Sequence, residues 1–466
     1  MPPEAQEAVR ARFECLERRI AELEQRLNTN STNSSKPPSS DPPSVKRRPP
    51  ASPSGKKRGG QAGHRHHTRT LVSPEALRHV FECKPPECRR CGHDLHGDDP
   101  APLRHQIAEV PPIQPTVDEY RLHRLTCPRC RTSTCAPLPP GVPTGAFGPR
   151  LRAILSVWAG AYRLGKRPIQ QLACDLFGLS ISTGMICRLE RQGAAELEAP
   201  VEDLREHVRQ ADSGHIDETS WRQDDEKMWL WVAVTRLVTV FTIAPTRGAE
   251  VARSMLGCAA RKVVVSDRLK SYNWIKRRQF CWAHLRRDFQ AMVDRGGEAG
   301  EVGQRLLEHS DALFGWWHRV RDGTLARSSY RLYVSWLRAC MREDLQRGAD
   351  GICPKTAGTC RELLAGETHL WTFVRVGGIE PTNNDAERAL RHGVIYRKLS
   401  GGTASESGSR FVERMLSVVA TCRQQDRDVL DYLTRCYQAQ LDGQPAPSLL
   451  PTPAPSCQLA GCLIEA

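Results

Sequence analysis

Apolar residues near the start of the chain recur at alternating spacings of four and three positions. The repeat runs through Val9, Phe13, Leu16, Ile20, Leu23 and Leu27. It predicts a charged helix within residues 1–30 whose apolar seam pairs with another helix as a short coiled coil, which would make the protein a homo-oligomer. The alternative is an amphipathic helix that docks on its own protein, because three heptads give marginal stability.

Residues 31–80 have no apolar periodicity and are rich in Ser, Pro, Gly and basic residues, as expected of a flexible linker. The basic positions are Lys46, Arg47, Arg48, Lys56, Lys57, Arg58, Arg65 and Arg69, with Asp41 as the acidic residue among them. This composition favours diffuse contacts with phosphates. A solvated linker that binds nothing in particular is the alternative.

Two Cys-x-x-Cys pairs lie in residues 81–137. Each pair places two thiolates about one tetrahedral edge apart, so the two pairs together predict one structural Zn²⁺ ion. The predicted ligands are Cys88, Cys91, Cys127 and Cys130. Cys83, His93, His96 or Cys135 could replace one of them, and a redox dithiol is the alternative chemistry. The alternating segment from Leu103 to Cys127 predicts two strands that join the pairs.

Residues 148–205 have helical periodicity. Within them we expect a helix, a tight turn at Phe177-Gly178-Leu179, an N-cap at Ser180 or Ser182, and a second helix. This is the pattern of a DNA-reading helix-turn-helix. Helical hairpins of the same form also occur in proteins that never contact DNA.

After Asp212 the pattern becomes extended. SGHIDETSW, MWLWVAVT and LVTVFTIA predict three successive strands, and an amphipathic helix over residues 249–256 precedes a fourth strand, KVVVSD. The predicted fold is an α/β sheet core. Helical periodicity from Trp282 to Trp371 predicts a helical insertion into it.

The length and the net charge narrow the class of protein. The 466 residues carry 67 Lys and Arg against 53 Asp and Glu, and 39% are hydrophobic, so we expect several domains and a polyanionic partner. No apolar run reaches the roughly 18 residues of a membrane span, and the N-terminus lacks a signal-peptide pattern. We therefore expect a cytoplasmic protein that does not contact membranes, in which the 18 cysteines are ligands or thiols.

Three acidic residues are candidates for catalysis. Asp217 lies within the first predicted strand, Asp267 ends the fourth, and Glu387 lies on the segment PTNNDAERALR. Buried carboxylates are costly unless a cation or a partner neutralises them, and three can hold two divalent ions. Each also has a structural alternative: a turn contact for Asp217, a helix cap for Asp267, and for Glu387 a capping box with Asn384 as the N-cap.

The order of several motifs resembles bacterial transposases of the insertion sequence sixty-six family, a group of DDE transposases with a ribonuclease-H-like catalytic fold. The resemblance extends to about residue 435. It rests on TNSTNSSKPPSSD, GKKRGGQAGH, the two Cys-x-x-Cys pairs, HIDETSW, VVVSDRLKSY, FCWAHLRRDF and EPTNNDAERALRHGVIYRKLSGG.

The resemblance implies that Asp217, Asp267 and Glu387 bind two catalytic Mg²⁺ ions, and that the four cysteines hold zinc. It implies a catalytic domain over residues 206–435, with a helical insertion at about 282–375. We expect His284, Arg286 and Arg287 near the scissile phosphate, the alternative being a packed core histidine with solvated arginines. Arg388 and Arg391, which flank Glu387, are expected to bind DNA. The Pro-rich tail, residues 436–466, does not match the family.

The implied activity is DNA strand cleavage and strand transfer at the ends of an insertion sequence. The partners would be the terminal repeats and target DNA, with accessory transposition proteins possible. Two alternatives remain: a DNA-binding regulator without catalysis, and a nuclease of the same fold. The regulator would leave the three acids without a function.

Overall fold

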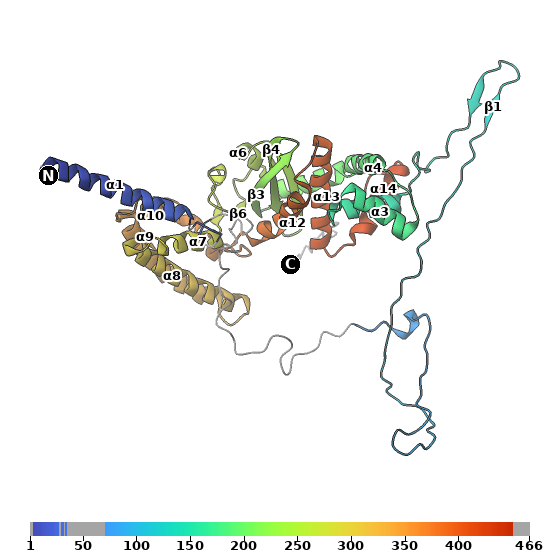
Figure 1. The fold of residues 1–466 in the computed structure, drawn as a ribbon, viewed down its shortest axis with the longest axis horizontal. Helices are drawn as coiled ribbons and strands as arrows, with labels where there is room; N and C mark the ends of the chain where they lie inside the picture. Colours follow the sequence, from blue (N-terminus) through green and yellow to red (C-terminus); the bar gives the residue numbers. More distant parts are fainter. Residues whose placement is uncertain (1–2, 28, 32, 35–69, 451–466) are drawn as a thin grey trace, which may run out of the picture. The chain divides into compact units, whose positions relative to one another are not determined.

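The computed structural model describes residues 3–27, 29–31, 33–34 and 70–450 (Figure 1). The chain divides into two compact units, residues 43–116 and residues 1–42 with 117–466, and each is described by itself. The predicted phosphate contacts at Lys46 to Arg58, with Arg65 and Arg69, lie outside the described residues. So does the tail beyond residue 450.

The first helix, α1 (Pro3–Leu27), confirms the helical prediction at the start of the chain. Its six seam residues are all exposed, with between 44% and 80% of each side chain accessible. The seam is therefore free to pair, and the coiled coil itself stays a prediction. No helix in the described part of the chain is long and apolar enough to cross a membrane.

The two strands predicted between the cysteine pairs are mostly wrong. From Leu103 to Cys127 the structure has one short strand, β1 (Arg124–Thr126), which pairs with β2 (Ser133–Cys135) beyond the second pair. The apolar residues of the predicted strands remain 73% to 98% exposed at Leu103, Ile107, Val110 and Val117. Alternation alone does not make a strand where no surface buries the apolar face.

Four helices precede the sheet: α2 (Pro149–Gly160), α3 (Lys166–Phe177), α4 (Thr183–Glu196) and α5 (Glu198–Gln210). The predicted turn between α3 and α4 is confirmed. Gly178 ends α3 in the left-handed conformation at φ 66°, and the Ser182 hydroxyl caps α4 by accepting the Met185 N–H at 3.1 Å. DNA reading by this pair stays a prediction.

The four predicted strands and one that was not predicted, β7, form a five-stranded mixed sheet in the order β5-β4-β3-β6-β7. Its members are β3 (Ser213–Gln223), β4 (Glu226–Val234), β5 (Thr239–Ala244), β6 (Val263–Ser266) and β7 (Arg278–Phe280). β3, β4 and β5 form an antiparallel meander, while β6 lies parallel to both β3 and β7. α6 (Ala249–Leu256) connects β5 to β6, which both run parallel to β3. This arrangement is consistent with a ribonuclease-H-like core.

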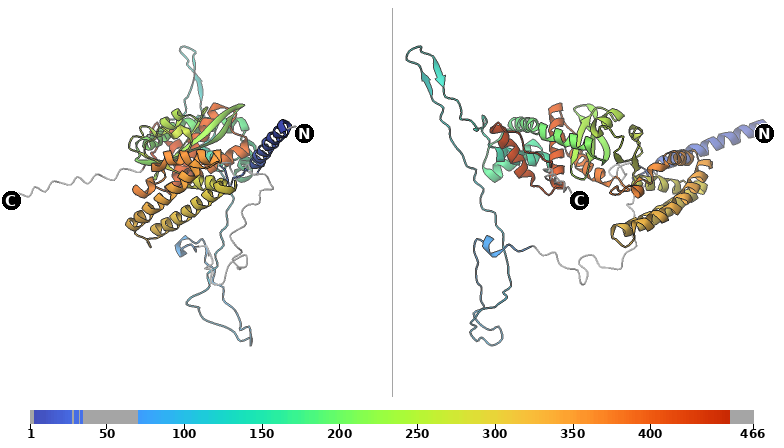
Figure 2. Two further views of the ribbon diagram at one scale, coloured as in Figure 1. Left: turned by 90° about the vertical axis from the view of Figure 1, so that its left-hand side faces the viewer. Right: turned by 180° about the vertical axis from the view of Figure 1, so that it is seen from behind.

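Helices cover both faces of the sheet (Figures 1 and 2). Ala233 packs toward α5 and α6, whereas Leu230 and Val234 face α12 (Asn384–Ser400) and α13 (Glu406–Gln424). The alternation of β4 thus separates two buried surfaces.

The outer edge of β5 is closed by α13. The backbone N–H groups of Thr239 and Phe241 donate to the hydroxyls of Thr421 (3.1 Å) and Ser417 (2.9 Å), and Ile243 donates to the Glu413 carboxylate. A spacing of four residues on a helix nearly matches two residues on a strand, so one helix face serves three strand positions. An exposed strand edge is thereby removed.

Between β7 and α12 the chain forms a helical segment with a second core, which also includes Val263, Val265 and Phe280 of the sheet. The segment consists of α7 (Trp282–Val293), α8 (Gly297–Arg321), α9 (Arg327–Asp350), α10 (Pro354–Ala365) and the short α11 (Thr372–Arg375). The last helix of the described chain, α14 (Val429–Leu441), packs near α2.

Candidate active site

Asp217 and Asp267 are brought together by strand register. β3 and β6 pair in parallel with Ser213 opposite Val263 and His215 opposite Val265. Continuing both strands by two residues places Asp217 level with Asp267. Asp217 also lies directly opposite Val232 on β4, so it shares the sheet face that α12 covers.

Asp267 is held by its neighbours just beyond β6. Its carboxylate Oδ1 accepts the Leu269 N–H at 3.0 Å, and its backbone carbonyl accepts from the Arg278 guanidinium. Arg278 is buried and also donates from Nε to Ser266 Oγ at 2.8 Å. Burial lowers the pKa of Arg278 to about 10, which leaves it charged at neutral pH. Asp267 thus shapes the turn before a short 3₁₀ helix but does not cap it, because the N-cap is Leu269 and no side chain caps this helix.

Glu387 lies in the first turn of α12, but not in a capping box. The N-cap is Asn383, one residue before the predicted Asn384, so that prediction was wrong. The Asn383 side chain points away from the helix: Nδ2 donates to the Ile216 carbonyl at 2.9 Å, and Oδ1 lies 3.1 Å from His215 Nδ1. Asn383 therefore fixes the start of α12 against β3, next to Asp217.

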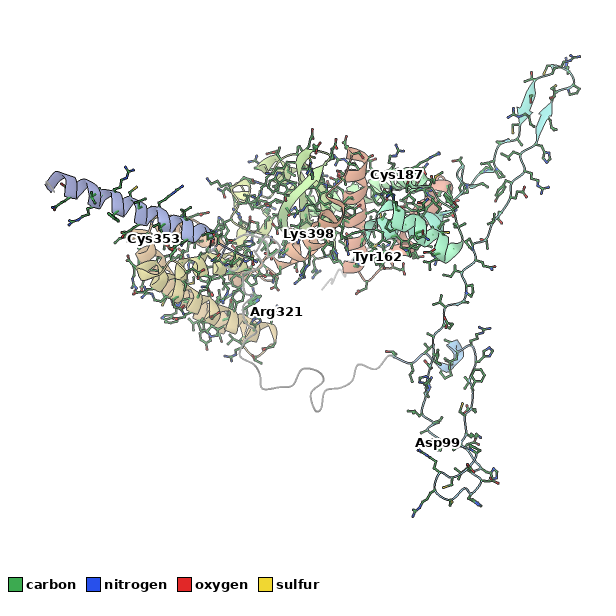
Figure 3. The ribbon with its side chains drawn as sticks, in the orientation of Figure 1. Asp99, Tyr162, Cys187, Arg321, Cys353 and Lys398 are labelled. Atoms are coloured by element: carbon green, nitrogen blue, oxygen red, sulfur yellow. The ribbon has the colours of Figure 1, made fainter. Side chains whose placement is uncertain are left out.

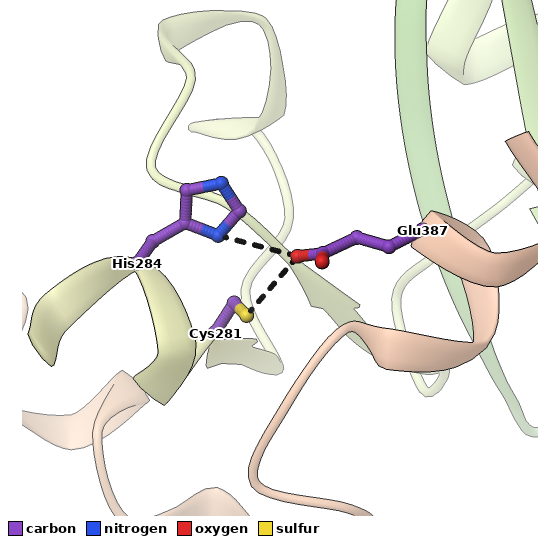
Figure 4. A group of neighbouring side chains, drawn as sticks. All are labelled: Cys281, His284 and Glu387. Atoms are coloured by element: carbon purple, nitrogen blue, oxygen red, sulfur yellow. Dashed lines mark hydrogen bonds and ion pairs between the residues drawn. The ribbon is translucent and has the colours of Figure 1, made fainter. Parts of the chain in front are cut away.

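The Glu387 carboxylate points toward the start of α7 (Figure 4). Its Oε1 lies 3.9 Å from Cys281 Sγ and 3.6 Å from His284 Nδ1, which is buried and has no hydrogen-bond partner within the described residues. Cys281 Sγ also accepts the Asn383 N–H at 3.1 Å. In the described part of the chain, this is the one place where three or more metal-ligating side chains have ligand atoms within 4.8 Å of one another.

The three predicted catalytic acids interact electrostatically. Burial, followed by repulsion from Glu218 and Asp267, raises the pKa of Asp217 well above its usual value, and Glu387 contributes in the same direction. Clustered carboxylates that share one partly desolvated place favour either a proton or a cation. The arrangement is therefore chemically suited to divalent metals, which prefer oxygen ligands.

A neighbouring polar group was missed by sequence reasoning. Glu218 follows Asp217 but points to the opposite sheet face, where Arg247 contacts its carboxylate at 2.5 Å and the Tyr272 hydroxyl donates to it. Burial and the charge of Asp267 raise the pKa of Glu218. The available signal was the tyrosine that closes VVVSDRLKSY, five residues after Asp267.

The predicted DNA-contacting arginines have different surroundings. Arg286 is engaged by Asp311 at 2.6 Å on α8, and Arg388 pairs with Asp385 within α12. Arg391 is exposed, and Arg287 is half-buried. Of this predicted set, His284 alone lies beside a candidate catalytic acid.

Each cysteine pair forms the same backbone turn. The Cys88 N–H donates to the His93 carbonyl and the Gly92 N–H to the Cys88 carbonyl, both at 2.9 Å. In the second pair, Cys127 repeats both bonds at 2.9 Å with Thr132 and Arg131. Gly92 and Arg131 both take left-handed conformations, at φ 70° and 58°.

One thiol in each turn has a lowered pKa. In the second turn, the Thr132 side chain, 3.3 Å from Cys130 Sγ, and the nearby Cys127 thiol help to lower the pKa of Cys130 to about 7. Backbone hydrogen bonds, first from Arg90, lower the pKa of Cys88 in the first turn. Thiolates are the form that binds metal.

Comparison with known families decides the class of this molecule. Residues 144–410, more than half of the chain, match the family described as Transposase IS66 family. This chain belongs to the IS66 transposase family. The match includes the sheet, all three acids and the helical segment between β7 and α12. Residues 4–70 match a family of unknown function, DUF6444.

Two relatives come from Sinorhizobium fredii (strain NBRC 101917 / NGR234). Uncharacterized protein y4qI is 25% identical over 304 residues, covering 58% of this chain and 55% of the relative. Uncharacterized protein y4hP is 24% identical over 390 residues, covering 74% of this chain and 68% of the relative. The chain thus spans little more than half the length of the first relative.

Proposed function

We propose that this chain cleaves DNA strands at the ends of an insertion sequence and joins them to target DNA. The observation that carries the proposal is that Asp217 lies near enough to Asp267 and Glu387 for both negative charges to raise its pKa. Family membership gives the substrate class. The raised pKa of Asp217 supports a cation at this place, because a metal would relieve the repulsion.

In this proposal the three carboxylates bind two Mg²⁺ ions. Metal ions bound there would activate a water or a DNA 3′-hydroxyl and stabilise the leaving oxygen. The chain's own residues position the ligands: Asn383 ties Glu387 to β3, and Arg278 holds the turn of Asp267. His284 lies beside Glu387, where it can contact a phosphate oxygen or orient the carboxylate. No side chain is required as a nucleophile.

The remaining regions take supporting roles in the same proposal. The exposed seam of α1 would pair with a second copy, residues 31–80 would contact phosphates, and residues 148–205 would bind DNA. Residues 81–137 would form a structural zinc domain that holds one Zn²⁺ through the four cysteines. The two matching turns, each with an activated thiol, support zinc binding. A cytoplasmic location follows from the DNA substrate.

Incubation with labelled element ends separates this function from its alternatives. The transposase produces both nicked and joined strands in Mg²⁺ and neither in EDTA. A regulator binds the ends without cutting them, and a nuclease of this fold cuts without joining. Asp217→Ala, Asp267→Ala and Glu387→Ala should each abolish cleavage while the ends are still bound. Asp225→Ala, at an exposed acid in the β3–β4 turn, is the matched control and should cleave normally.

A further inference from the structure

A cavity flanks α12 along the side of the helix that carries Asp385, Arg388 and His392. It has a volume of about 500 Å³ and lies between the end of α2, the β4–β5 turn, α12 and α13. Arg163, which follows Tyr162 (labelled in Figure 3), is one of the residues that line it. The charged and titratable residues that line the cavity are Arg163, Arg236, Asp385, Arg388, His392 and Arg423.

The charge around this cavity is not balanced. Four guanidinium groups face one carboxylate, Asp385, and that carboxylate already pairs with Arg388. Within the described residues, Arg163, Arg236 and Arg423 take part in no ion pair. Arg163 is half-buried, while Arg236 and Arg423 are exposed. A guanidinium fork matches a phosphate group, so an anion that enters the cavity would meet an excess of positive charge with suitable donors.

The backbone of Arg163 has a strained conformation. Arg163 takes the left-handed conformation at φ 63°, which residues other than glycine seldom adopt. Its Nη1 lies 3.3 Å from His392 Nδ1, and its buried Nε has no hydrogen-bond partner in the described structure. Strained backbone tends to persist where it positions a functional side chain. Here it turns a partly unpaired guanidinium into the cavity wall.

The surroundings of His392 disfavour its protonated form. Burial, then the positive charges of Arg163, Arg423 and Arg391, lower its pKa. The ring is therefore neutral at physiological pH and can accept the Arg163 hydrogen bond without adding repulsion.

We propose that this cavity binds a backbone phosphate of the DNA substrate. The inference deepens the proposed function and rests on it. DNA is favoured over a free anion by position, because Asp385 and Glu387 share one turn of α12. In addition, Asp385 Oδ2 lies 3.6 Å from His215 Nε2, two residues from Asp217. A strand held at the carboxylates carries further phosphates at spacings of about 3.4 Å along the duplex axis, so a neighbouring one can enter the cavity.

The test measures binding of a fluorescent duplex by anisotropy at about 50 to 200 mM salt, without added divalent metal so that no strand is cut. The variants are Arg163→Asn, since Asn tolerates the left-handed backbone, and Arg423→Ala. Each should bind several-fold more weakly, with the slope of log K against log salt reduced by about 0.9. Arg423→Lys keeps the charge and should retain most of the slope. Arg319→Ala, on the exposed side of α8, should match the wild type.

Unchanged affinity and slope in both cavity variants would overturn the proposal, provided that thermal unfolding shows all proteins folded. The proposal also fails if inorganic phosphate raises the unfolding temperature of the wild type only, while all variants bind DNA equally. That result would assign the cavity to a free anion. If the wild type itself fails to bind any duplex, the proposed function falls with this site, so the two failures are distinguishable.

Discussion

Gly393 of α12 packs directly against Leu230 of β4, so Gly393→Ala should move the helix that carries Glu387. A Cβ at this position would lie 2.2 Å from Leu230 Cδ2, and Leu230 is completely buried. Ordinary contact begins at about 3.4 Å, so helix and leucine must separate by about 1.2 Å, the difference between the two distances. Overpacking of this kind costs about 1–3 kcal/mol. The better helix propensity of alanine returns roughly 1 kcal/mol.

The expected net result is a loss of about 0–2 kcal/mol in the free energy of unfolding, measured by urea denaturation. The effect on cleavage should be larger. Glu387 lies six residues before Gly393, about 9 Å along the helix, and a metal ligand displaced by about 1 Å can cost roughly 100-fold in rate. Strand cleavage of labelled ends at saturating Mg²⁺ measures this loss.

Two further variants isolate the cause. Gly315→Ala, in α8, meets no atom within 4 Å and should gain roughly 0.5–1 kcal/mol with normal cleavage. Leu230→Val removes the clashing Cδ2, so combined with Gly393→Ala it should recover much of the lost cleavage. If Gly393→Ala is as stable as Gly315→Ala and cleaves at the wild-type rate, the close contact with Leu230 does not position the helix.

Four other predictions concern separate parts of the chain. Because burial and nearby carboxylates raise the pKa of Asp217, the metal-free wild type should lose stability as pH rises above the usual carboxyl range. In EDTA at about pH 8, Asp217→Asn should therefore have a larger free energy of unfolding than the wild type, and this difference should shrink toward about pH 4. Ten times the Kd of Mg²⁺ should stabilise the wild type by about 1.4 kcal/mol and the variant less, as thermal unfolding would report. Arg278→Met should lower the cleavage rate and cost about 1–3 kcal/mol for each buried acceptor left unpaired; unchanged cleavage would remove its positioning role. Purified protein should contain near one zinc per chain by elemental analysis, and Cys88→Ser with Cys127→Ser should lose it; retention in that variant would contradict the ligand assignment. Leu16→Asp on the exposed seam of α1 should shift the protein to a smaller assembly by light scattering; an unchanged mass would exclude pairing through α1.

Sequence patterns predicted the sheet where the signal was long and regular. β3, β4, β5 and β6 were each recognisable from runs of β-branched and aromatic residues, and α6 from its amphipathic pattern. β7 was missed because it has three residues, two of them Arg278 and Gln279, whose burial depends on partners from elsewhere in the fold. A buried polar strand has no local signature.

The candidate site shows the same limit. Asp217 and Asp267 could be proposed from strand positions, because parallel register then aligns them. The contact of Glu387 with Cys281 and His284 depends on how α12 meets α7, which no local pattern encodes. The N-cap at Asn383 was misassigned to Asn384 because its side chain bonds to β3 and not to its own helix. Because the two asparagines are adjacent, neither residue type nor spacing shows which of them is the N-cap.

Anomalous diffraction from crystals of the chain grown with Mn²⁺ tests the catalytic centre most directly, because Mn²⁺ shares the oxygen preference of Mg²⁺. Manganese contacted by Asp217, Asp267 and Glu387 together is the predicted result. Manganese bound by Glu387 together with Cys281 and His284, and not by Asp217 or Asp267, would contradict the assignment of the three acids to one catalytic site.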